Sequence, residues 1–95
     1  MASLYVTEYA TLGAGQVVAE SPPVAIQKVS YTGTAGTSSA FNARTRYIRV
    51  HTDGICSFAI GTSITATTSY PRMAADQTEY FAVTPGHTIS AITNS

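Results

Sequence analysis

The chain has 95 residues, of which 11% are charged, and five basic and five acidic side chains give a formal net charge of zero. This length supports one hydrophobic core, so residues 1–95 are predicted to form a single domain. Without a basic excess, nucleic acid is not expected as the main partner, because phosphate binding needs cationic side chains. No segment approaches the roughly 20 apolar residues of a membrane helix, so no membrane partner is expected.

The N-terminal residues have neither a basic region nor a sustained apolar run, so they do not indicate a signal peptide. We therefore expect a soluble protein made in the cytoplasm. The single cysteine, Cys56, excludes an internal disulfide framework, and its apolar surroundings predict a core side chain. Near-zero net charge promotes association, so the composition favours a component of an assembly.

The N-terminal half contains three candidate strands. Residues 4–9 alternate and are rich in aromatic and β-branched side chains, and residues 16–20 form a shorter candidate before Pro22-Pro23. Residues 24–31 form a third, in which the apolar positions change parity at the middle. That change indicates either a β-bulge at Gln27-Lys28 or a strand buried on different faces at its two ends. Residues 32–39 contain only small and polar side chains, which predicts a mobile surface loop, and Phe41 after them is an expected core anchor.

The segment from Thr45 to Gly61 is predicted to form two β-strands joined by a tight turn, and the rest of the fold is expected to be arranged around it. Asp53-Gly54 between two alternating apolar runs is a strong hairpin signal. A three-residue loop, with Gly54 in the left-handed conformation, pairs Val50 with Cys56 and places the apolar side chains on one face. Tyr47, Arg49 and His51 then lie on the opposite face.

A second hairpin is predicted near the C-terminus. Residues 78–83 form a strand, Thr84-Pro85-Gly86 a turn, and residues 87–93 the returning strand, while residues 62–77 form a weakly patterned crossing. About eight short strands without an amphipathic helix predict an all-β protein, an antiparallel β-sandwich. A jelly-roll-like order is the first expectation, and an immunoglobulin-like sandwich is the alternative.

The residues that could carry chemistry do not form a recognisable catalytic or metal-binding motif. His51 and His87 have no metal-ligand spacing, and Asp53 is explained by its turn. The serines lie in no nucleophile elbow, and the glycine-rich segments do not lead from a strand into a helix. We therefore expect no enzyme activity, no cofactor and no metal site.

The tyrosines suggest a different role. Six are present, and tyrosine is favoured where a side chain is apolar at one end and hydrated at the other, as in protein interfaces. Tyr47 and Tyr80 are predicted to lie in a subunit interface. The N-terminal strand, with residues 1–15 as a docking or exchanged arm, could pair with another chain. The candidate interface residues are Leu4, Tyr5, Val6, Tyr9, Tyr47, Arg49 and Tyr80.

Two stretches resemble small virion proteins of tailed bacteriophages. The first is residues 41–51, FNARTRYIRVH. The second combines Phe58-Ala59-Ile60-Gly61, Ala66-Thr67-Thr68, residues 72–75 and residues 78–86. The resemblance covers roughly residues 41–93 and is a pattern of strands and turns.

This resemblance implies a homo-oligomeric β-sandwich in the virion, a capsid decoration or cement protein that fastens neighbouring coat subunits. Its partners would be the major capsid protein or another virion protein, and copies of itself. The alternatives are a neck, tail or fibre component, or a glycan- or receptor-binding β-sandwich whose tyrosines stack on sugars.

Overall fold

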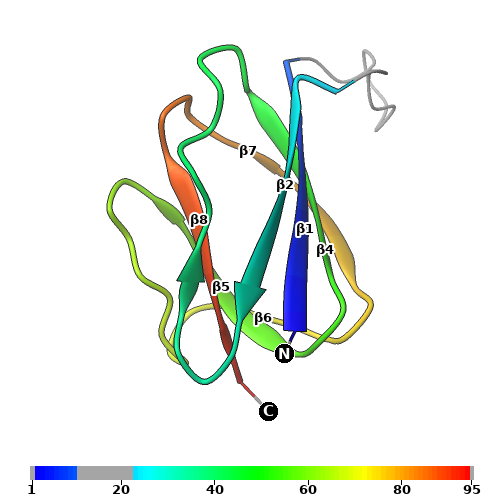
Figure 1. Cartoon of the computed structure of the whole chain (residues 1–95), viewed down its shortest axis with the longest axis vertical. Helices are drawn as coiled ribbons and strands as arrows, with labels where there is room; N and C mark the ends of the chain where they lie inside the picture. The colour runs from blue at the N-terminus through cyan, green and yellow to red at the C-terminus, as the bar shows by residue number, and fades with distance from the viewer. Residues whose placement is uncertain (1, 11–22, 95) are drawn as a thin grey trace.

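The computed structural model describes residues 2–10 and 23–94. They form two antiparallel four-stranded sheets packed face to face (Figure 1). The first has the order β2-β1-β4-β7, with bounds Ala25–Tyr31, Ala2–Tyr9, Tyr47–Thr52 and Thr78–Ala82. The second has the order β3-β8-β5-β6, with bounds Gly36–Thr37, Thr88–Thr93, Cys56–Gly61 and Arg72–Met73. The predicted β-sandwich is confirmed, whereas the expected strand at residues 16–20 lies outside the described residues.

The strand order is that of a circularly permuted jelly roll, in which the strand that is usually last is the first in the chain. In a jelly roll the final strand lies between the first and third strands of one sheet. Here β1 occupies that place, between β2 and β4, and the remaining strands follow the jelly-roll order. The immunoglobulin-like alternative does not fit, because its third strand pairs with its sixth, whereas β3 pairs with β8.

Both predicted hairpins are wrong, because in each case the two strands do not pair with each other. Strands β4 and β5 belong to different sheets, and so do β7 and β8. β4 pairs with β1 and β7, and β5 pairs with β8 and β6. Each short connection is therefore an arch from one sheet to the other. The predicted apolar faces are nevertheless correct, because two strands facing each other across a core need the same alternation as two strands side by side.

The arch after β4 is held by hydroxyl groups that bind the Gly54 carbonyl. The Thr52 hydroxyl donates to this oxygen at 2.6 Å, and the Tyr31 hydroxyl donates to it at 2.8 Å. The backbone N–H of Ser3 donates to the Asp53 carboxylate at 2.7 Å, which ties the arch to β1. The expected left-handed conformation of Gly54 is not found, since the glycine with positive φ among the described residues is Gly86.

The N-terminal half differs from prediction in two details. Residues 32–39 are not only a loop, because Gly36 and Thr37 form β3 and pair with Ala91 and Ser90 of β8. The β1–β2 register runs without interruption from Ala2 to Glu8, so no bulge occurs at Gln27-Lys28. The apolar positions change parity because Val29 and Tyr31 point into the core, whereas Ile26 points to solvent.

The hydrophobic core lies between the two sheets and contains the expected side chains Cys56 and Phe41, both buried. The rings of Phe58 and Phe81, from opposite sheets, meet with centroids 5.2 Å apart. The core cluster comprises Leu4, Val6, Val29, Tyr31, Phe41, Ile48, Val50, Cys56, Met73, Ile89 and Ala91.

The outer surface of the second sheet is covered by the chain's own segment between β5 and β6, residues 62–71. Ser57 and Ser90 point away from the core, yet both are fully buried. The Ala66 N–H donates to the Ser90 hydroxyl at 2.9 Å, and the Asn94 amide donates to the Ser57 hydroxyl at 2.8 Å and to the Thr68 carbonyl at 3.3 Å. The centre of this sheet, around Ser57 and Ser90, is therefore enclosed on both sides.

Candidate functional site

The outer surface of the first sheet gathers residues from all four strands. Its central strands bring Tyr5 of β1 opposite Lys28 of β2 and His51 of β4, while Arg49 of β4 lies opposite Tyr80 of β7. These side chains alternate with the buried ones, so they point away from the core. We call this surface the outer face and define it by Tyr5, Ile26, Lys28, Tyr47, Arg49, His51 and Tyr80.

The outer face carries most of the exposed apolar side chains. Four large hydrophobic side chains in the described ranges are exposed, and three of them lie here: Ile26 (73%), Tyr5 (40%) and Tyr80 (38%). The fourth, Tyr70, belongs to the segment that covers the other sheet. Because isolated exposed apolar side chains are common but clusters are not, this face is the best candidate contact surface.

Tyr5 lies at the centre of a group of polar and aromatic neighbours. The Lys28 ammonium lies 5.6 Å from the centroid of the Tyr5 ring, a distance at which a cation is attracted to the ring face. On its other side the Tyr5 and His51 ring centroids are 6.4 Å apart. A hollow of about 370 Å³, lined in part by Tyr5, Ile26 and Lys28, adjoins this group.

The predicted interface residues fall into two groups. Tyr5, Tyr47, Arg49 and Tyr80 lie together on the outer face, where Ile26 and Lys28, not predicted, join them. The others are Leu4 and Val6, which point into the core and are 0% and 1% exposed, and Tyr9, which is also buried.

The strand that carries Leu4 and Val6 lies inside its own sheet, hydrogen-bonded to β2 and β4. These two side chains would contact another chain only if β1 were exchanged between protomers. Exchange therefore stays a prediction, as does the interface role of the residues that project from β1.

The histidines take part in local hydrogen bonds. The His51 Nδ1 atom lies 2.8 Å from the Thr78 hydroxyl, and its Nε2 atom is 3.9 Å from an Asp76 carboxylate oxygen. The His87 backbone N–H donates to the Thr84 carbonyl at 3.2 Å. Within residues 2–10 and 23–94, no three His, Cys, Asp or Glu side chains come close enough to hold a metal ion.

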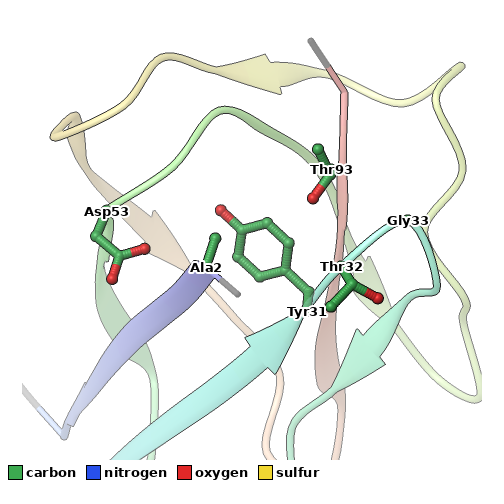
Figure 2. Close-up of a pocket in the computed structure, with 6 residues that line it drawn as sticks. All are labelled: Ala2, Tyr31, Thr32, Gly33, Asp53 and Thr93. Atoms are coloured by element: carbon green, nitrogen blue, oxygen red, sulfur yellow. The ribbon is translucent and has the colours of Figure 1, made fainter.

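A second hollow, of about 590 Å³, lies where the two described ends of the chain meet (Figure 2). Figure 2 shows the Tyr31 ring between Ala2 and Thr93, with its hydroxyl on the side of Asp53. The polar groups here already have partners: the Tyr31 hydroxyl binds Thr52 and Gly54, and the Asp53 carboxylate accepts from Ser3. The hollow lies between the start of β1 and the end of β8. In a jelly roll of ordinary order, the strands at these two places are joined by a loop.

The buried phenol of Tyr31 is predicted to lower the stability of the fold at alkaline pH. Burial raises the pKa of its phenol from 10.0 to about 12, with a smaller opposing effect from the hydrogen bond to Thr52. The unfolded chain releases this proton from about pH 10 and the folded chain only from about pH 12, so the free energy of unfolding falls between these values. We expect urea unfolding at about pH 9 and about pH 11.5 to show a loss on the order of 1–2 kcal/mol from this group.

The Tyr31→Phe variant is the control for this loss. It should be less stable than the unmodified chain at pH 9, because it lacks the hydrogen bond to Gly54, but it should lose less stability on going to alkaline pH. An equal alkaline loss in both proteins would contradict the assignment to Tyr31.

None of the described residues forms a helix long and apolar enough to span a membrane. In comparisons with known proteins, no family model, no curated protein and no solved structure matches the chain.

Proposed function

We propose that this chain is a structural protein of a bacteriophage virion, a homo-oligomeric capsid decoration or cement protein that stabilises the head by bridging coat subunits. The proposal joins the resemblance of residues 41–93 to small virion proteins with a jelly-roll sandwich that has one uncovered face. Its activity would be contact with a lattice, and its residues would act through shape, apolar area and charge.

The observation that carries the proposal is the difference between the two outer surfaces of the sandwich. The centre of the second sheet is covered by residues 62–71 and Asn94, with Ser57 and Ser90 buried beneath them. The first sheet instead presents Tyr5, Tyr80 and Ile26 to solvent. Tyrosine and arginine are enriched in protein interfaces, so the outer face has the composition of a contact surface.

A formal net charge of zero supports the same proposal. A small protein without net charge is poorly protected against association, and a domain of 95 residues buries a limited share of its own surface. Both properties suit a subunit that gains stability from its neighbours, because binding to the folded state raises apparent stability by mass action.

The test is to add the purified chain to heads assembled without it from the coat protein of the same genome. We expect saturable binding at many equivalent sites and a higher melting temperature of the heads, since a ligand that binds only the assembled lattice stabilises it. Native mass spectrometry of the free chain measures its oligomeric state. No binding to the heads would contradict the proposal, and binding at a single vertex would favour a neck or tail component.

The hollow beside Tyr5 favours a glycan- or receptor-binding module as the second candidate. An exposed tyrosine ring next to a hollow of about 370 Å³ could stack on a sugar ring. Binding to a glycan array that is lost in a Tyr5→Ala variant, together with no binding to heads, would select this alternative.

A further inference from the structure

We infer that the outer face docks on an acidic surface of a different protein chain, and that Arg49 and Lys28 select this partner. The inference rests on the proposed function and adds to it the contact surface and the charge of the partner. In the virion that partner would be an acidic patch on the coat lattice.

The charges of the outer face are all of one sign. Lys28 and Arg49 project from the middle of β2 and β4, and His51 lies two residues further along β4. The acidic side chains of these strands point the other way: Glu8 is buried, and Glu79 shares the inward parity of Val50, its partner in the register. On the four strands of the first sheet, the outer side therefore carries cations and no carboxylate.

The nearby carboxylates lie at one end of this face and have other partners. Asp76 lies near His51, and Asp53 accepts a hydrogen bond from the Ser3 backbone. Among the described residues, neither Lys28 nor Arg49 has a carboxylate within ion-pair distance, and the Arg49 guanidinium has no hydrogen-bond partner. Its planar set of donors is thus free to bind a carboxylate from another chain.

Arg49 is positioned as the centre of a contact. In the register it lies between Thr7 of β1 and Tyr80 of β7, and along its own strand it lies between Tyr47 and His51. A half-buried arginine on a central strand, with aromatic residues as neighbours in the sheet, is the kind of residue whose truncation most often costs binding energy.

Two other partners fit the charges less well. A second copy docked through the same face would bring Arg49 and Lys28 toward like charges, which is unfavourable. Oligomer formation is therefore expected to use another surface. Nucleic acid is disfavoured because duplex binding commonly uses about 6–10 cationic contacts, and this face offers two permanent cations in a chain of zero net charge.

The experiment measures binding of charge-reversal variants to the undecorated heads described above. The test variant combines Lys28→Glu with Arg49→Glu. The control, Arg72→Glu, makes the same kind of change at an exposed side chain of β6, in the second sheet and away from the outer face. We expect the double variant to bind at least about tenfold more weakly and the control to bind normally. Binding of the unmodified chain should weaken when NaCl rises from about 50 mM to about 500 mM.

Folding is monitored by circular dichroism and thermal unfolding, and Arg49→Lys should retain more affinity than Arg49→Glu because it keeps the charge. If the unmodified chain binds the heads and the double variant binds equally well, the inference is overturned while the proposed function stands. If the unmodified chain does not bind, both fail. Variant-sensitive binding to double-stranded DNA in place of the heads, or dissociation of a homo-oligomer by Arg49→Glu with head binding retained, would also overturn the inference.

Discussion

Replacing Gly36 by alanine is expected to destabilise the protein by about 3 kcal/mol, because the added methyl group has no room. A Cβ atom at this position would lie 2.0 Å from the Ser30 carbonyl oxygen, which is backbone and cannot rotate away. Gly36 belongs to β3 and Ser30 to β2, so relieving the overlap would separate the edges of the two sheets where they approach. The expected measurement is a lower midpoint of urea unfolding.

Gly33→Ala is the matched control. A Cβ atom on Gly33 meets nothing within 4 Å, and the residue lies in the loop just before β3. Surface substitutions of this kind usually change stability by about 0.5 kcal/mol or less. If both variants unfolded at the same urea concentration, the close approach of β3 to β2 would be refuted.

The second large effect is expected at Glu8, a residue that is 1% exposed and whose carboxylate joins three segments of the chain. One carboxylate oxygen accepts from the Asn42 N–H and the Thr45 hydroxyl, each at 2.8 Å, and the other accepts from the Gln27 amide at 2.8 Å. Glu8→Ala leaves these donors without their acceptor. We expect a loss of about 3 kcal/mol in the free energy of unfolding, measured by urea titration.

A reciprocal exchange separates hydrogen bonding from simple loss of volume. Glu8→Gln alone places two amide donors against each other at Gln27, so it should cost about 1–2 kcal/mol. Adding Gln27→Glu restores a donor and an acceptor at this contact and keeps the hydrogen bond from the Ser39 N–H. It loses only the longer donation from the Gln27 amide to the Ser39 carbonyl, at 3.2 Å. The double variant should therefore be more stable than Glu8→Gln. Additive losses would show that the network does not determine the stability of this end of the sandwich.

The sequence was sufficient to predict which side of β4 faces the core. Alternation identified Ile48 and Val50 as core residues and placed Tyr47 and Arg49 on the other side, as the structure has them. It could not identify the partner of each strand. Parity is the same for a hairpin and for an arch between two sheets, so Asp53-Gly54 was mistaken for a hairpin turn.

The information that separates the two arrangements is long-range. The arch depends on Tyr31, more than twenty positions earlier in the sequence, which binds the Gly54 carbonyl, and on Ser3, which binds Asp53. The two-residue strand β3 was missed for a similar reason. Its two residues, Gly36 and Thr37, are too few to show an alternating pattern, and they form a strand only through their pairing with Ala91 and Ser90 of β8.

The candidate site could be predicted in part. Outward parity selected Tyr47, Arg49 and Tyr80 without knowledge of their neighbours, but the strand order that places them beside Tyr5 and Lys28 was not accessible. The signal for Ile26 was present as the parity change within residues 24–31. Ile26 has the opposite parity to Val29 and Tyr31, so it is exposed if only one face of the strand is buried. Which face is buried depends on the position of the second sheet, which the sequence did not reveal.

Binding to the heads should cover the outer face and leave the opposite surface of the sandwich accessible. A single cysteine introduced by Thr7→Cys lies on the outer side of β1, and one introduced by Thr65→Cys lies on the exposed segment over the second sheet, while Cys56 is fully buried. Maleimide labelling of bound and free protein compares the two positions. We predict that binding protects the cysteine at position 7 and leaves the one at position 65 reactive. Protection at position 65 with continued labelling at position 7 would contradict the account.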